Sequence, residues 1–169
     1  NISLRLADGL VVFENGQGVL LIADVGVAAI LSGDLSFHAH TLGAAGSFAI
    51  ELNTRTLAVN QTVTIGAEDI LIDLEPGDYV KINGTDVVVT IADQSLSGNF
   101  SFEEDGTTVR VSATDVGMSL GPIATPYVVV NAAAGDFIIS ADGAVGGLAI
   151  PDGGLILTVP GLAIGLGNV

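Results

Sequence analysis

The chain has 169 residues, which is long enough for one domain of ordinary size and too short for two domains of that size. Its 4 Lys and Arg residues stand against 19 Asp and Glu residues, and the net charge of −15 argues against binding to nucleic acid or to an anionic membrane surface. Hydrophobic residues make up 49 % of the chain, so this is not the composition of a disordered acidic protein. The absence of Cys excludes disulfides, thiolate metal sites and a Cys nucleophile.

The first residues, 1–6, already alternate between polar and apolar types, as a half-buried strand does. They include no initiator Met and no signal peptide, so we expect a processed chain or a piece of a longer one. Two later stretches are strongly apolar. Residues 18–31 are too few to span a bilayer and include Asp24, and residues 148–169 are interrupted by two Pro and five Gly. No transmembrane segment is predicted.

Strand patterns continue along almost the whole chain. Alternating segments, which place one face on a core and the other toward water, lie at 46–54 and 107–115. Further runs are apolar on both faces and rich in β-branched residues, and turn pairs such as Asn-Gly, Asp-Gly and Pro-Gly recur about every ten residues. Only 25–30 could form a short helical turn. The sequence therefore predicts an all-β protein with almost no helix, its antiparallel strands arranged in a sandwich or in a β-solenoid-like repeat array.

Internal similarity is the most informative feature of the sequence. Leu31–Phe37 (LSGDLSF) returns as Leu96–Phe102 (LSGNFSF), with five of seven positions identical. A longer similarity joins the two ends of the chain, because Leu10–Leu31 aligns without gaps on Tyr127–Leu148 at an offset of 117 residues. The order and spacing of these matches indicate repeated units, although convergent strand patterning in a Gly- and Val-rich chain is the alternative.

A further short match lies upstream, where residues 2–4 resemble residues 118–120 at an offset of 116. From these offsets we predict that residues 1–117 form one full β repeat unit, circularly offset, and that residues 118–169 begin a second, similar unit. We also predict that Leu10–Leu31 and Tyr127–Leu148 follow the same strand–turn–strand path.

Three segments, Gly46–Thr54, Leu96–Glu103 and Val109–Val116, resemble the tandem repeats of very long exported bacterial surface proteins of the adhesin-like type. The resemblance consists of strand and turn patterns that cover most of the chain. It implies a structural or adhesive role outside the cell and carries over no catalytic residue. The calcium-binding GGxGxD nonapeptide of many secreted repeat proteins is absent, so that kind of β-roll is not expected.

His38 and His40 are the only two histidines, and on a strand they would share one face. A metal site would need a third and a fourth ligand, and the local sequence offers none nearer than Asp34. We therefore expect two half-exposed histidines on a solvent face. The chain also has no recognisable nucleophile motif, P-loop or dinucleotide-binding motif, so no enzymatic activity is predicted.

Acidic residues gather at two predicted turns, where carboxylates beside backbone carbonyls are ligands suited to Ca²⁺. The alternatives are a solvated acidic turn, which is commoner, and a pair of glycosidase carboxylates, which sequence alone does not place face to face. No other metal or cofactor is predicted. The candidate ligands for a structural Ca²⁺ ion are Asp73, Glu75, Asp78, Glu103, Glu104 and Asp105.

The mean hydropathy of +0.67 indicates more apolar surface than one core readily hides, and the basic residues are too few to protect strand edges from pairing. We therefore expect a structural or adhesive repeat protein, located at the cell surface or in an extracellular fibre, whose partners are copies or continuations of itself joined through strand edges near its ends. A surface glycan is a further candidate partner. The alternatives are a carbohydrate- or lipid-binding β domain and a hydrolase or lyase built on a β-solenoid.

Overall fold

The computed structural model describes residues 2–6, 11–39, 42–92, 94–122, 124–159 and 162–165. Strands take up about 80 % of the described residues, every strand pairing is antiparallel, and the described residues contain no helix, which confirms the predicted all-β class. The strands are β1 (Ile2–Leu6), β2 (Val11–Ala23), β3 (Gly26–Ala39), β4 (Leu42–Asn53), β5 (Val59–Ile65), β6 (Glu68–Leu74), β7 (Tyr79–Ile91), β8 (Gln94–Asp105), β9 (Thr108–Leu120), β10 (Val128–Ser140), β11 (Gly143–Ala149), β12 (Leu155–Val159) and β13 (Leu162–Gly165).

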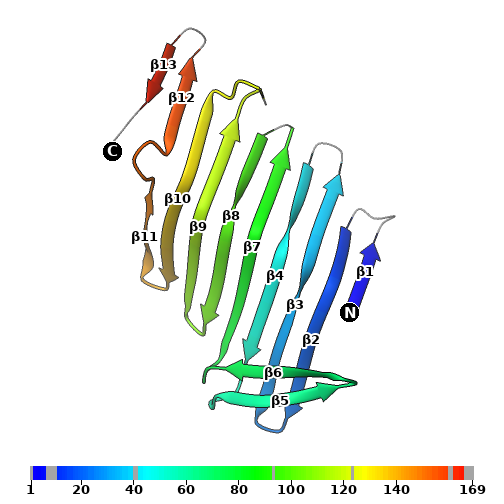
Figure 1. Ribbon diagram of the computed structural model, residues 1–169. Helices are drawn as coiled ribbons and strands as arrows, with labels where there is room; N and C mark the ends of the chain where they lie inside the picture. The colour runs from blue at the N-terminus through cyan, green and yellow to red at the C-terminus, as the bar shows by residue number, and fades with distance from the viewer. Residues whose placement is uncertain are drawn as a thin grey trace.

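Eleven strands form one broad sheet in which nearly every strand lies beside its neighbour in sequence (Figure 1). The order is β1-β2-β3-β4-β7-β8-β9-β10-β12-β13. Strand β11 also pairs with β10, along residues 134–140, whereas β12 pairs with residues 128–130 of the same strand. The remaining two strands, β5 and β6, form a hairpin that lies across one end of β2, β3 and β4. The predicted alternatives were a sandwich and a β-solenoid-like array. The described residues form one broad sheet, and a second layer lies on it only where this hairpin crosses.

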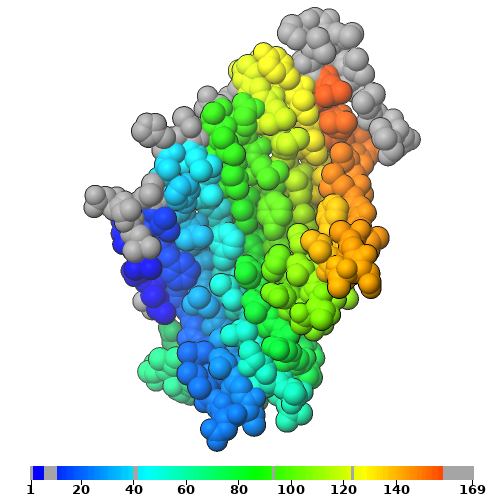
Figure 2. All heavy atoms as spheres, turned by 180° about the vertical axis from the view of Figure 1, so that it is seen from behind, coloured from blue at the N-terminus to red at the C-terminus, as the bar shows by residue number. Residues whose placement is uncertain are grey.

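Strand alternation and register give the sheet two different faces. One face, which we call the polar face, carries side chains such as Glu14, Asp34 and Ser47, which lie directly opposite one another on β2, β3 and β4. The other face, the apolar face, carries Phe13 and Leu35 in the same way. The β5–β6 hairpin lies on the polar face, and the view from the other side shows the strands with no described element over them (Figure 2).

The small core of the molecule lies beneath the β5–β6 hairpin. Ile72 of β6 and Ala28 of β3 are fully buried, and Val59 and Leu74 are 4 % and 3 % exposed. At the base of the hairpin the fully buried Asn53 donates hydrogen bonds to the carbonyls of Glu75 and Leu57, at 2.7 and 3.2 Å. Burial of these apolar side chains and the bonds of one amide hold the hairpin on the sheet.

The predicted strand–turn–strand path shared by Leu10–Leu31 and Tyr127–Leu148 is found over the described residues 11–31 and 127–148. Within them, strands β2 and β10 have the same length, and each is followed by a two-residue turn into the next strand. Gly18 pairs with Leu31 in the first hairpin as Gly135 pairs with Leu148 in the second. Each glycine is also needed for close packing, because a Cβ atom there would lie 2.8 Å from a backbone carbonyl oxygen of the neighbouring strand, that of Ile30 or of Gly147.

The repeat extends further than the sequence comparison indicated. Strands β11 and β12 together take the place of β3, with residues 150–154 between them, and β13 takes the place of β4. Val159 pairs with Leu162 in the same register as Ala39 pairs with Leu42, now at an offset of 120 residues. Three inserted residues around Pro151 account for the change from 117 to 120.

The upstream match needs a correction. Leu4 faces Phe13 as Met118 faces Val130, so Leu4 corresponds to Met118, and the true offset is 114 rather than 116. The segment between β9 and β10 (121–127) is longer by three residues than that between β1 and β2 (7–10), which an ungapped comparison cannot register. The predicted boundary between units at 117 and 118 falls inside β9, where the sheet is continuous.

Candidate functional site

A row of irregular backbone positions crosses the middle of the sheet. Four residues inside strands have positive φ angles: Asn15 (55°), Asp86 (51°), Asp115 (54°) and Ala132 (53°). Each lies where the strand register shifts, so that two residues of one strand oppose one residue of its neighbour. These β-bulges reverse the alternation of their strands, and they bend and twist the sheet along one line.

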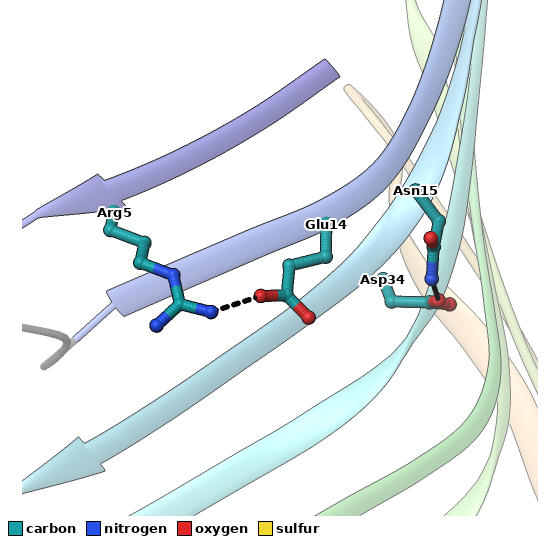
Figure 3. Close-up of polar contacts among 4 residues, drawn as sticks. All are labelled: Arg5, Glu14, Asn15 and Asp34. Atoms are coloured by element: carbon teal, nitrogen blue, oxygen red, sulfur yellow. Dashed lines mark hydrogen bonds and ion pairs between the residues drawn. The ribbon is translucent and has the colours of Figure 1, made fainter. Parts of the chain in front are cut away.

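The repeated heptapeptide supplies polar partners for the bulges. In Leu31–Phe37, Asp34 accepts a hydrogen bond of 2.8 Å from the Asn15 side chain (Figure 3). It accepts another, of 2.6 Å, from the Ser47 hydroxyl. These donors, the Asn15 amide first and Ser47 second, hold the pKa of the exposed Asp34 carboxyl below its ordinary value. Figure 3 also shows the neighbouring ion pair of Arg5 and Glu14, in which Nη2 and Oε1 are 2.5 Å apart.

Asn99 has the same role in Leu96–Phe102. Its Oδ1 atom accepts a hydrogen bond of 2.9 Å from the Asp86 backbone amide, and its Nδ2 atom donates one of 3.2 Å to the Asp115 carboxylate. Asp34 and Asn99 therefore occupy equivalent places in the two heptapeptides, each beside a left-handed residue of an adjacent strand. The repetition of the heptapeptide has a structural cause, since its Asp or Asn residue stabilises the bulge row.

Three of the six residues predicted to bind Ca²⁺ lie together. Glu75, Glu103 and Asp105 line one hollow on the polar face, which Tyr79 and Lys81 also line. Partial burial, followed by the negative charges of Glu51, Glu75 and Glu103, raises the pKa of Tyr79 above its ordinary value.

None of the other three predicted ligands lines this hollow. Asp73 is on β6, where it accepts a hydrogen bond of 2.9 Å from Asn60, and Asp78 lies in the turn before β7. Glu104 projects from the apolar face, because its neighbours Glu103 and Asp105 project from the polar one. The described residues contain no group of three or more His, Asp or Glu side chains arranged to hold a metal ion.

His38 is exposed on the polar face of β3, opposite Gly43, as predicted. His40 lies outside the described residues. In the part of the chain that the structure describes, no helix has the length and apolar character needed to cross a membrane.

The strand pattern did contain a signal for the bulge row, which sequence reasoning missed. In β2 the residues of the apolar face change from odd numbers (Phe13) to even numbers (Gly18, Leu20) across Asn15. Such a change of phase at an Asn or Asp residue marks a bulge, because these residues adopt the left-handed conformation more readily than most others.

Comparison with known proteins gives no relative for this arrangement: no protein-family model, curated protein or solved structure matches the chain.

Proposed function

We propose that this chain is a structural repeat protein in which successive units extend one β-sheet, and that it works outside the cell at a surface or in a fibre. The observation that supports this proposal is the return of β1-β2-β3-β4 as β9-β10-β11/β12-β13 within the same sheet. A second unit therefore begins in direct hydrogen-bonded continuity with the first, as in a tandem array.

The two outer edges of the sheet support the same proposal. Strand β13 is equivalent to β4, whose other edge pairs with β7, so a β7-like strand fits beside β13. Strand β1 is equivalent to the last residues of β9, whose other edge pairs with β8, so a β8-like strand fits beside β1. In the first unit the equivalent edges of β4 and β9 are paired with β7 and β8. The unpaired backbone groups of an open edge form hydrogen bonds with an added strand in the same way.

The charge of the chain is consistent with a soluble polymer. A net charge of −15 per 169 residues discourages lateral clumping of finished arrays. The proposed location outside the cell depends on the resemblance to exported bacterial surface repeats, and labelling of intact source cells with an antibody against the chain tests it.

A longer chain tests the extension of the sheet. Because Gly165 is equivalent to Ala45, residues 1–165 followed by residues 46–165 add one unit in the correct register. Six more strands, each about 4.8 Å from the next, should lengthen the sheet by about 29 Å in small-angle X-ray scattering. A chain that forms two separate bodies, or that gains no length, would contradict the proposal.

A matched control uses the same design with one residue removed at the joint, namely residues 1–165 followed by residues 47–165. A shift of one residue moves every apolar side chain of the joined strand to the wrong face. The control should therefore lose the added length and expose the second unit to proteolysis, whereas the in-register chain should resist it.

A further inference from the structure

The apolar face is almost free of polar groups. Register and alternation show which described side chains project from this face in the seven central strands, β2, β3, β4, β7, β8, β9 and β10. Only two of these side chains are polar, Gln94 and Glu104, and they lie at the two ends of β8. Its centre is still open to solvent, since Leu35, Leu96 and Phe102 are 37 %, 38 % and 39 % exposed. A soluble protein rarely leaves an apolar surface of this extent uncovered.

Large rings of the apolar face lie down against the sheet. Phe13 lies over Gly33 of the next strand, and Phe48 lies over Gly84 in the same way, so that a Cβ atom at either glycine would meet the ring. The glycines thus let large rings lie down against the sheet where they would otherwise project from it. An apolar sheet surface of this kind packs against the apolar surface of a second sheet at about 10 Å.

Charge is segregated to the other side of the molecule. The charged residues of the sheet strands, such as Glu14, Asp34, Glu51 and Asp136, project from the polar face, and Glu104 is the exception among the described strands. Two copies that meet through their apolar faces therefore keep almost all of their negative charge on the outside, where water solvates it.

From these observations we infer that the apolar face binds the apolar face of a second copy, which forms a two-layered sheet with both polar faces outward. Seven central strands of 12 to 14 residues cover about 1,400 Å². A stable interface needs about 800 Å² from each partner, so part of this face suffices. A two-fold axis makes such an interface self-complementary.

A second copy fits better than a lipid does. An individual hydrocarbon ligand needs a concave pocket that encloses most of its surface, whereas this face is the open side of one broad sheet. A bilayer with anionic lipids would repel a chain of charge −15 that has only 4 basic residues. The copy, by contrast, offers an apolar surface of the same extent. This interface is distinct from the sheet edges of the proposed function, and neither proposal depends on the other.

Two substitutions on adjacent central strands test the inference. Leu96 of β8 projects from the apolar face and is 38 % exposed, and Val88 of β7 projects from the polar face and is 41 % exposed. In sedimentation equilibrium we expect the unsubstituted chain to dimerise, Leu96→Glu to weaken the dimer at least about tenfold because a charge is buried without a partner, and Val88→Glu to leave it unchanged. Association through strand edges would respond equally to both substitutions.

Circular dichroism checks whether Leu96→Glu folds. If it does not fold, cysteine labelling still tests whether the apolar face is covered by a second copy. The chain contains no Cys, so Leu96→Cys and Val88→Cys each introduce a single thiol. The maleimide reaction at Leu96→Cys should slow as protein concentration rises, and that at Val88→Cys should not. A chain that stays monomeric at all concentrations, equal behaviour of the two variants, or a monomer that floats with phosphatidylcholine vesicles would each overturn the inference.

Discussion

Asn15 and Ala132 lie 117 residues apart in the sequence and have the same left-handed backbone conformation, with φ angles of 55° and 53°. Each is the fifth residue of its strand, β2 or β10, and each marks the point where the strand register shifts. An Asn side chain tolerates this conformation and an Ala side chain does not tolerate it well. The bulge is thus conserved between the two units while the residue that favours it is not, and Ala132 carries strain that Asn15 avoids.

Replacing Ala132 by Asn should therefore stabilise the protein. We expect a gain of about 0.5 to 1 kcal/mol in the free energy of unfolding, since the left-handed region costs an Ala residue roughly 1 kcal/mol. Urea denaturation measures the change. The matched control is Ala134→Asn in the same strand, where φ is not positive, and it should give no gain. Equal effects at both positions would show that the backbone conformation is not the cause.

Asn53→Ala should weaken the attachment of the β5–β6 hairpin. The buried Asn53 amide satisfies the Glu75 and Leu57 carbonyls, and loss of such a group costs about 1 to 3 kcal/mol. Hydrogen exchange should show faster exchange in residues 59–74 and little change in β8 and β9. Asn60→Ala, which removes a hydrogen bond between exposed side chains, is the control and should have a much smaller effect.

The pKa of Asp34 provides a test of the bulge row. Its carboxylate is stabilised by Asn15 first and Ser47 second, so the folded-state pKa lies below the ordinary value of 3.8. This contribution to stability is present above pH 3.8 and is lost as the pH falls through the folded-state pKa. Carbon-13 NMR titration should show the pKa of Asp34 rising in Ser47→Ala, and rising more in Asn15→Gly, which keeps the left-handed backbone. Ser36→Ala on the same face should leave it unchanged.

Substitution of both histidines should have little effect. His38 is exposed on the polar face, where substitutions usually change stability by no more than about 0.5 kcal/mol. We therefore expect His38→Ala combined with His40→Ala to fold and assemble as the unsubstituted chain does, by thermal denaturation and sedimentation. Retention of a transition metal by the unsubstituted chain, with its loss and a loss of assembly in the double variant, would contradict this prediction.

The sequence by itself determined the class of structure and the similar path of the two hairpins. Alternation of apolar and polar residues is a local property with a period of two, so it identifies strands and divides their side chains between two faces. The offset of 117 residues between Gly18 and Gly135 also predicted the register of the second hairpin, because each glycine pairs with an equivalent leucine.

Only the tertiary structure decided how the strands are arranged. Ile72 and Phe102 both occupy apolar positions of an alternating strand, so the sequence pattern does not predict different burial for them. Ile72 is nevertheless fully buried between the crossing hairpin and the sheet, whereas Phe102 is 39 % exposed on an open face. Alternation fixes the face from which a side chain projects, but what covers that face depends on contacts between distant segments. In this chain the buried Asn53 and the pairing of β4 directly with β7 direct residues 54–78 out of the sheet and over the polar face, which leaves the apolar face uncovered within the described residues.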